Sequence, residues 1–101
     1  MYKLKYLPLA LKDLHEITNY ITDILKTPKA AMDLIDTLDN TISLLKKFPY
    51  SCKIYQAEEH LETEYRMLSV KNYLVFYQVE GKTVEIHRII NARMDYDKFM
   101  H

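Results

Sequence analysis

The sequence is poor in the residues that hinge, break or cross-link a chain. Its 101 residues include one glycine, three prolines, one cysteine and no tryptophan. Because linkers and phosphate-cradling loops are rich in glycine, we expect neither an interdomain linker nor a nucleotide-binding loop. Cys52 can form no internal disulfide and no cysteine-based metal site. The sequence therefore predicts a single domain over residues 1–101, with no metal ion and no cofactor.

The chain also lacks an excess of charge and a long apolar run. Lysine and arginine number 14, as do aspartate and glutamate, so the formal net charge at pH 7 is zero. Such a chain has no overall field that attracts nucleic acid or anionic lipid, and a nucleic-acid role would require a local basic patch. No apolar run approaches the ~20 residues that span a bilayer, and residues 1–25 lack a signal-peptide layout. We expect a cytoplasmic protein that does not contact the membrane.

The first half of the chain contains clear periodic patterns. Residues 2–7 alternate apolar side chains with lysines, which is typical of a half-buried strand. Apolar residues then recur three and four positions apart over 9–25 and again over 28–47, which predicts two amphipathic helices. Thr27 is expected to cap the second helix, with its side chain accepting a bond from an unpaired amide, and Pro28 to open it. The short connection makes the helices an antiparallel hairpin.

The second half predicts an antiparallel sheet. Residues 50–64 show neither period and are expected to form a loop with one irregular strand at most. Stretches of β-forming residues follow at 65–70, 73–79 and 83–90, and the short breaks between them predict a three-stranded meander. Residues 95–101 would form a short closing helix or a tail. The predicted fold class is α+β, with an N-terminal strand, a helical hairpin and a meander, and with both helices on one face of the sheet.

Charged side chains lie away from the apolar stripes of the predicted hairpin. A solvated face is the ordinary interpretation of such a pattern. A ridge formed by two long helices is also suited to contacts with another protein. Seven residues are expected on this outer face: Lys12, Asp13, Glu16, Asp33, Asp36, Asp39 and Lys46.

Four stretches of the chain occur in an order that is found in a known family. They are the opening strand with Pro8-Leu9-Ala10 and Asp13-Leu14; Ile42 to Pro49, with Leu45, Phe48 and Pro49; Tyr65-Arg66-Met67-Leu68 with Lys71-Asn72-Tyr73 and Phe76-Tyr77; and Arg88-Ile89-Ile90 with Arg93, Asp95 and Tyr96. Together they span nearly the whole chain and resemble the RelE/ParE toxin superfamily. The resemblance implies the toxin half of a bacterial type II toxin–antitoxin pair, neutralised by a cognate antitoxin whose tail wraps the toxin surface.

The activities within this superfamily diverge, so two toxic functions stay open, and a degenerate toxin that only binds its antitoxin is a third possibility. RelE-like members cut messenger RNA on the ribosome, whereas ParE-like members poison DNA gyrase. The long hairpin resembles ParE-like members more closely. Many members carry His-Gly-Arg-Arg-Asp near the end, where this chain has Asn91-Ala92-Arg93-Met94-Asp95 and so lacks the imidazole and one cation. The resemblance favours a ParE-like toxin that binds a target such as gyrase, with a ribosome-dependent endoribonuclease as the alternative.

If the chain is a nuclease, the resemblance assigns the chemistry to three residues. Arg66 and Arg93 would hold the phosphate, and Tyr96 would stack on a base or assist proton transfer. Each residue also has a structural interpretation. Arg66 would pair with a loop carboxylate, Arg93 would pair with Asp95 or cap the sheet edge, and Tyr96 would pack with a solvated hydroxyl.

His87 is a further candidate for acid–base chemistry. It lies in a stretch where Val84, Ile86 and Arg88 alternate with Glu85, His87 and Ile89, so the two sets are expected on opposite faces of a strand. An imidazole there could act as a general acid or base. A hydrogen-bonded histidine with a structural role is the alternative.

Overall fold

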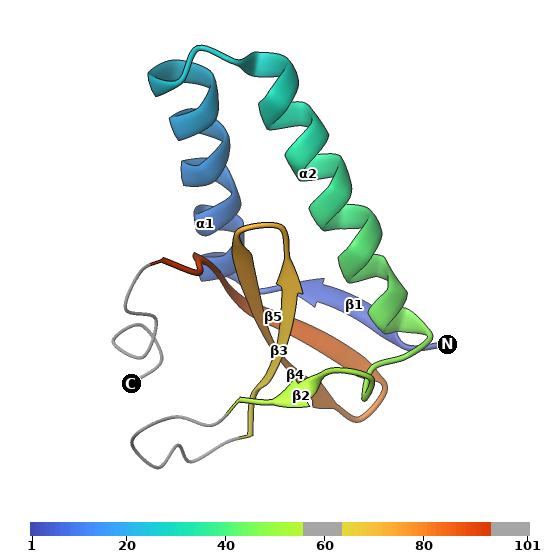
Figure 1. Cartoon of the computed structure of the whole chain (residues 1–101). Helices are drawn as coiled ribbons and strands as arrows, with labels where there is room; N and C mark the ends of the chain where they lie inside the picture. Colours follow the sequence, from blue (N-terminus) through green and yellow to red (C-terminus); the bar gives the residue numbers. More distant parts are fainter. Residues whose placement is uncertain (56–63, 94–101) are drawn as a thin grey trace.

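A sheet covered on one face by two helices forms the protein (Figure 1). The computed structural model describes residues 1–55 and 64–93. No helix within these residues is both long enough and apolar enough to cross a membrane. In chain order the elements are β1 (Lys3–Tyr6), α1 (Pro8–Asn19), the π-helical turn η1 (Tyr20–Ile24), α2 (Pro28–Ser43), the 3₁₀ turn η2 (Leu44–Lys46), β2 (Lys53–Ile54), β3 (Arg66–Val70), β4 (Tyr73–Glu80) and β5 (Thr83–Asn91).

The sheet has five strands in the order β1-β5-β4-β3-β2. The antiparallel meander of β3, β4 and β5 confirms the predicted three-stranded unit. The N-terminal strand β1 joins it by pairing in parallel with β5, with Leu4 opposite Val84. The two-residue β2 is the irregular strand that was expected within the loop over 50–64. It pairs with β3 and adds a strand to the edge of the predicted sheet. The predicted short helix or tail over 95–101 lies outside the described residues.

The apolar stripes of both helices face the sheet along most of their length, as their periodicity predicts. Leu11, Ile24 and Leu25, which the same periodicity assigns to the first stripe, are more than half exposed. Because a helix places residues three and four apart on one side, each stripe presents a continuous apolar surface to the strands. Burying such side chains is the main favourable contribution to folding, at roughly 25 cal/mol per Å² of apolar surface. The buried residues of this layer are Ala10, Leu38, Ile42 and Leu45 from the hairpin and Val70, Val75, Tyr77, Val84, Ile86 and Ile89 from the sheet.

A smaller cluster lies on the opposite face of the sheet. Tyr55, Leu74, Phe76 and Ile90 are buried there, and the Tyr55 and Phe76 rings meet edge to face at 5.0 Å. Strand β4 is therefore buried on both faces. This explains why its sequence is a nearly continuous apolar run and does not alternate.

The connection between the helices differs from the expectation. The amide of Leu25 donates to the carbonyl of Tyr20 at 3.2 Å, and Lys26 then adopts a left-handed conformation with φ of 56°. Thr27 occupies the N-cap position of α2, as predicted, but its side chain makes no capping hydrogen bond there. Its amide and its hydroxyl instead donate to the carbonyl of Ile21, at 3.1 and 3.4 Å. Thr27 therefore closes the first helix, because the left-handed turn points both of its donors back along the chain.

A β-bulge interrupts β5. Tyr77 lies opposite Ile86 and Phe76 lies opposite Arg88, so His87 is an extra residue in the ladder. The bulge corrects the expected alternation, because Ile86 and Ile89 both contribute to the helix-side core although they are three residues apart. One inserted residue has exchanged the faces of every side chain that follows it.

Two hairpin turns offer a test of backbone strain. Lys71-Asn72 joins β3 to β4 and Gly81-Lys82 joins β4 to β5, and the first residue of each pair has positive φ, 55° and 58°. A left-handed conformation costs a non-glycine residue roughly 1–2 kcal/mol. We expect Lys71→Gly to raise the free energy of unfolding by up to about 1 kcal/mol and Gly81→Ala to lower it by about 1 kcal/mol, measured by urea denaturation.

A Cβ at Gly81 would have no heavy atom within 4 Å, so the second change would act on the backbone alone. A lower free energy of unfolding for Lys71→Gly would show that contacts of the Lys71 side chain outweigh the strain.

Candidate functional site

The edge of β5 changes partner halfway along its length. Strand β1 pairs with its first half only, and the last main-chain bond between them joins the amide of Leu7 to the carbonyl of Ile86 at 3.0 Å. Beyond this point the Asp13 side chain of α1 takes over. Its Oδ2 accepts a hydrogen bond from the amide of Ile89 at 2.9 Å. A helix side chain therefore satisfies a sheet-edge donor where the neighbouring strand has ended.

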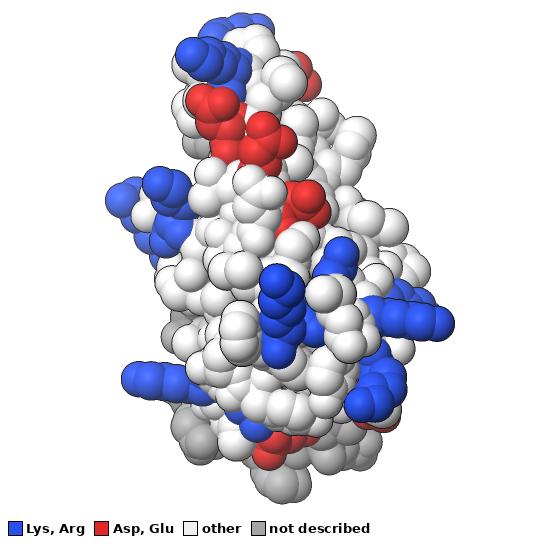
Figure 2. All heavy atoms as spheres, turned by 90° about the vertical axis from the view of Figure 1, so that its right-hand side faces the viewer, with Lys and Arg blue, Asp and Glu red and all other residues white. Residues whose placement is uncertain are grey.

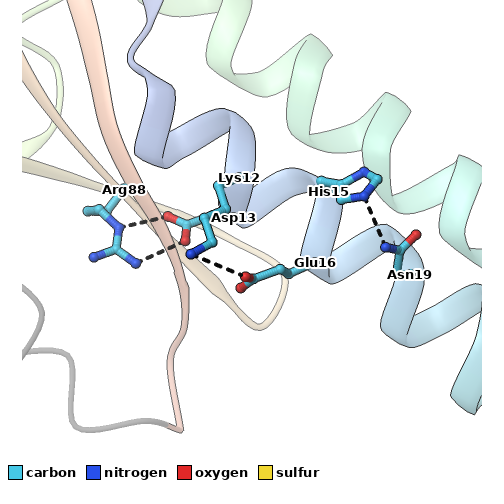
Figure 3. A network of polar contacts seen from close by, with 6 residues as sticks. All are labelled: Lys12, Asp13, His15, Glu16, Asn19 and Arg88. Carbon is cyan, nitrogen blue, oxygen red and sulfur yellow. Dashed lines mark hydrogen bonds and ion pairs between the residues drawn. The ribbon is translucent and has the colours of Figure 1, made fainter.

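The bulge decides which amide meets Asp13. In a regular strand, residues two apart present their main-chain groups to the same edge, so Ile86 and Arg88 would share one. Because His87 is inserted, Ile89 and not Arg88 presents its amide to the edge that faces α1. Arg88 then binds the same carboxylate through two bonds, from Nε to Oδ2 at 2.8 Å and from Nη2 to Oδ1 at 2.9 Å (Figure 3).

Asp13 was expected on the solvated outer face, and that expectation is wrong. Asp13 is only 7% exposed. Its hydrogen bond with Arg88 is the main cause that raises the pKa of the Arg88 guanidinium, and burial of the guanidinium opposes this rise. A signal for its position is present in the sequence. Asp13 lies three residues after Ala10 and four before Ile17, which places it on the apolar side of the helix. A carboxylate there needs a buried cation or amide as partner.

A hollow of about 300 Å³ opens beside this ion pair. Asp13, Glu16 and Tyr20 line it from the helical side, and Tyr73 and Arg88 line it from the sheet. Neighbouring polar contacts on α1 are weaker, since Lys12 and Glu16 lie 3.9 Å apart and are both exposed (Figure 3). The hollow combines apolar walls with a few charged groups, which suits a peptide side chain or another small organic group.

Arg66, a predicted phosphate-binding residue, ties the loop after α2 to the sheet. Its Nη1 donates to the carbonyl of Cys52 at 2.8 Å and lies 3.5 Å from that of Tyr50, and its guanidinium lies 5.0 Å from the centre of the Tyr50 ring. Glu64 is 3.7 Å from Nη2, as the structural interpretation proposed. In the same loop, Tyr77 donates its hydroxyl to the carbonyl of Pro49 at 2.8 Å, and burial is the main cause of its raised pKa.

His87 lies on the other face of the sheet. Its ring meets the Tyr65 ring edge to face at 5.1 Å, with Nδ1 3.4 Å from the hydroxyl and Nε2 3.6 Å from a Glu85 oxygen. Burial lowers the pKa of His87, and the nearby Glu85 carboxylate opposes this effect. Because Tyr65 and Arg66 are consecutive in sequence, their side chains point to opposite faces. Arg66 and His87 are therefore separated by the sheet.

Arg93 lies at the far end of the strands from Arg66. Its amide donates to the side chain of Asn91 at 2.9 Å. Arg66 lies opposite Tyr77, whereas Asn91 lies opposite Tyr73, four residues or about 13 Å away along β4. Among the described residues the predicted nuclease groups are thus not brought together, and no three metal-ligating side chains are grouped. Tyr96, and Asp95 as a partner for Arg93, lie outside the described residues.

Comparison with known proteins identifies the family. The sequence model of the "ParE toxin of type II toxin-antitoxin system, parDE" matches residues 4–96. The chain belongs to the ParE toxin family. Membership in the ParE family confirms the resemblance to the RelE/ParE superfamily and makes the chain a toxin of the type II class. No curated protein matches it in sequence.

A solved structure of a ParDE system shares this fold. A chain of the "Chromosomal ParDE TA system from P. aeruginosa" superposes with a TM-score of 0.73 at 20% identity, covering 90% of this ParE family chain and 96% of that one. A chain of the "RelB-RelE antitoxin-toxin complex from Methanococcus jannaschii" covers 94% of this chain and 98% of its own, at 20% identity and a TM-score of 0.49. The ParDE structure confirms the predicted α+β fold.

The Asp13 ion pair yields a stability prediction. Asp13→Ala leaves the Arg88 guanidinium and the Ile89 amide without their shared acceptor, and we expect a loss of about 3 kcal/mol in the free energy of unfolding, measured by urea denaturation. Glu16→Ala, one turn away and exposed, should change it by less than about 0.5 kcal/mol. Equal losses in the two variants would contradict the role of Asp13.

The position of His87 yields a pH prediction. Its pKa is lowered in the folded protein, so protons bind the unfolded chain more readily. The stability that neutral His87 contributes is complete above the unfolded pKa of about 6.5 and falls as the pH decreases toward the folded pKa. We expect His87→Gln to lose less stability than wild type between about pH 7.5 and about pH 5. His15→Gln, on the exposed side of α1, should keep the wild-type slope in the same urea titrations.

Proposed function

We propose that this ParE family toxin arrests growth by binding a protein target such as DNA gyrase, and that a cognate antitoxin neutralises it. One observation carries the choice against RNA cleavage. The Arg66 guanidinium binds the carbonyl of Cys52, stacks on Tyr50 and lies on the opposite face of the sheet from His87. Cleavage of RNA by a 2′-hydroxyl requires a proton acceptor and phosphate-binding cations around a single phosphate. The described candidates are spread over two faces and two ends of the sheet.

The tip of the helical hairpin supports a role in protein contacts. Tyr20, Ile24 and Leu25 lie there, and each is more than half exposed. Exposed apolar side chains gathered at one place are typical of protein-binding surfaces. A second hollow extends from Tyr20 along the helices to the β3–β4 turn at Asn72 and Tyr73, so this surface continues into the hollow beside Asp13.

The antitoxin proposal has independent support. The solved structure with the same fold belongs to a ParDE toxin–antitoxin system. A helix or an extended segment can bind a groove that has apolar walls and charged groups at its margin. The joined hollows beside α1 have these properties, and we propose them as part of the antitoxin contact.

The target can be tested with purified protein. We expect the toxin to inhibit gyrase supercoiling and to leave messenger RNA intact on translating ribosomes. Ile24→Glu at the hairpin tip should weaken gyrase inhibition at least about tenfold, because it places a charge in an apolar contact. Leu9→Glu, a matched change at an exposed leucine at the start of α1, should have little effect.

The variant Arg66→Ala distinguishes gyrase inhibition from ribosome-dependent RNA cleavage. It should reduce thermal stability and leave gyrase inhibition by the folded fraction unchanged, because Arg66 holds the loop after α2. Ribosome-dependent cleavage by the wild type that disappears in a folded Arg66→Ala variant would replace this proposal with the endoribonuclease.

A further inference from the structure

One end of the molecule collects lysines from separate parts of the chain. The amide of Tyr2 donates to the carbonyl of Lys46 at 2.9 Å, and the amide of Lys3 donates to that of Lys82 at 2.8 Å. These bonds place β1, the end of α2 and the β4–β5 turn side by side. The loop after α2 joins them, because the Tyr2 and Tyr50 rings meet edge to face at 6.4 Å. We call this surface the lysine end, and its cations are Lys3, Lys46, Lys47 and Lys82.

The lysines of this end form no ion pairs with the described part of the chain. Three of them are exposed and Lys46 is half-buried. Of the residues that the structure describes, none places a carboxylate oxygen within 4.0 Å of these four amines. Residues 1–7 and 46–55 contain no acidic residue, and Glu80 is an acidic residue next to the β4–β5 turn in sequence. Figure 2 shows several Lys and Arg side chains on the lower half of the face that it views, with one acidic group above them and further acidic atoms at the lower edge.

The second helix carries exposed acidic side chains. Asp33, Asp36 and Asp39 are exposed along α2. The net charge of zero therefore includes separate regions of opposite sign. An anion is attracted to the lysine end and repelled from these three aspartates, which restricts where a polyanion can bind.

Aromatic rings accompany the cations. Phe48 is 60% exposed and Tyr50 is 58% exposed, both in the loop that joins α2 to β2. The Lys82 amine lies 5.2 Å from the centre of the Tyr2 ring, so cations and rings are interleaved. Exposed rings beside lysines match the bases and phosphates of a single strand, whereas a duplex keeps its base faces stacked inside. An acidic peptide would use the lysines alone.

We propose that the lysine end binds single-stranded nucleic acid, with the lysines contacting phosphates and Phe48 stacking on a base. This site lies away from the hairpin tip and from the hollow beside Asp13, so it does not depend on the proposed gyrase contact. The proposal concerns the binding of nucleic acid and involves no cleavage of it.

Fluorescence anisotropy of the full chain with a labelled single-stranded oligonucleotide of about 20 nucleotides tests the proposal. We expect saturable binding that weakens with salt, with a slope near −3 in log K against log salt if all four lysines contact phosphate. The double variant Lys47→Glu/Lys82→Glu should bind at least about tenfold more weakly. Phe48→Ala should weaken binding to the single strand about tenfold and leave duplex binding unchanged.

The control makes the same charge change elsewhere. Lys26→Glu/Lys29→Glu replaces two exposed lysines near the hairpin tip and should keep the affinity within about twofold. An equal loss in this control would reduce the effect to non-specific attraction and overturn the proposal. Duplex binding as tight as single-strand binding would also overturn it, as would displacement by a polyglutamate peptide at lower concentrations than by unlabelled oligonucleotide. Circular dichroism confirms that each variant is folded.

Discussion

The carboxylate of Asp13 holds the two layers of this protein in register. It lies on the apolar side of α1, accepts the amide of Ile89 where β1 has ended, and binds Arg88 through two further bonds. A buried carboxylate is tolerated only when it is paired, and here one side chain satisfies a main-chain donor and a guanidinium together. The arrangement also depends on the bulge at His87, because only the shifted ladder presents the Ile89 amide to the helix. Helix, bulge and ion pair therefore form one interdependent unit.

Pairing of polar groups also explains why Arg66, which looks catalytic in the sequence, has structural partners. Arg66 binds the carbonyl of Cys52 and so connects β3 to the loop after α2, and Tyr77 reaches the carbonyl of Pro49 in that loop. Main-chain groups in a loop between packed layers need such partners, since an unpaired buried carbonyl is unfavourable. These bonds hold the loop that carries Phe48 and Tyr50. The proposed nucleic-acid surface thus depends in part on Arg66, which the nuclease hypothesis assigned to phosphate binding.

The described residues form several distinct surfaces in addition to the core. The hairpin tip exposes apolar side chains, the hollow beside Asp13 combines apolar walls with charged groups, and the lysine end is basic and aromatic. The proposed binding of both a target and an antitoxin requires more than one contact surface. The separation of charge along the molecule allows these surfaces to have different ligands although the total charge is zero.

The sequence by itself determined the helices, the meander and the face that each helix buries, because the spacing of residues such as Leu38, Ile42 and Leu45 is a local property. It also determined the family. Only the tertiary structure decided the bulge at His87, the burial of Asp13 and the parallel pairing of β1 with β5, because each depends on a partner far along the chain. Asp13 and Arg88 are 75 positions apart, and no periodicity links them. The lysine end has the same origin, since its four cations become neighbours only when strands and helix ends converge in space.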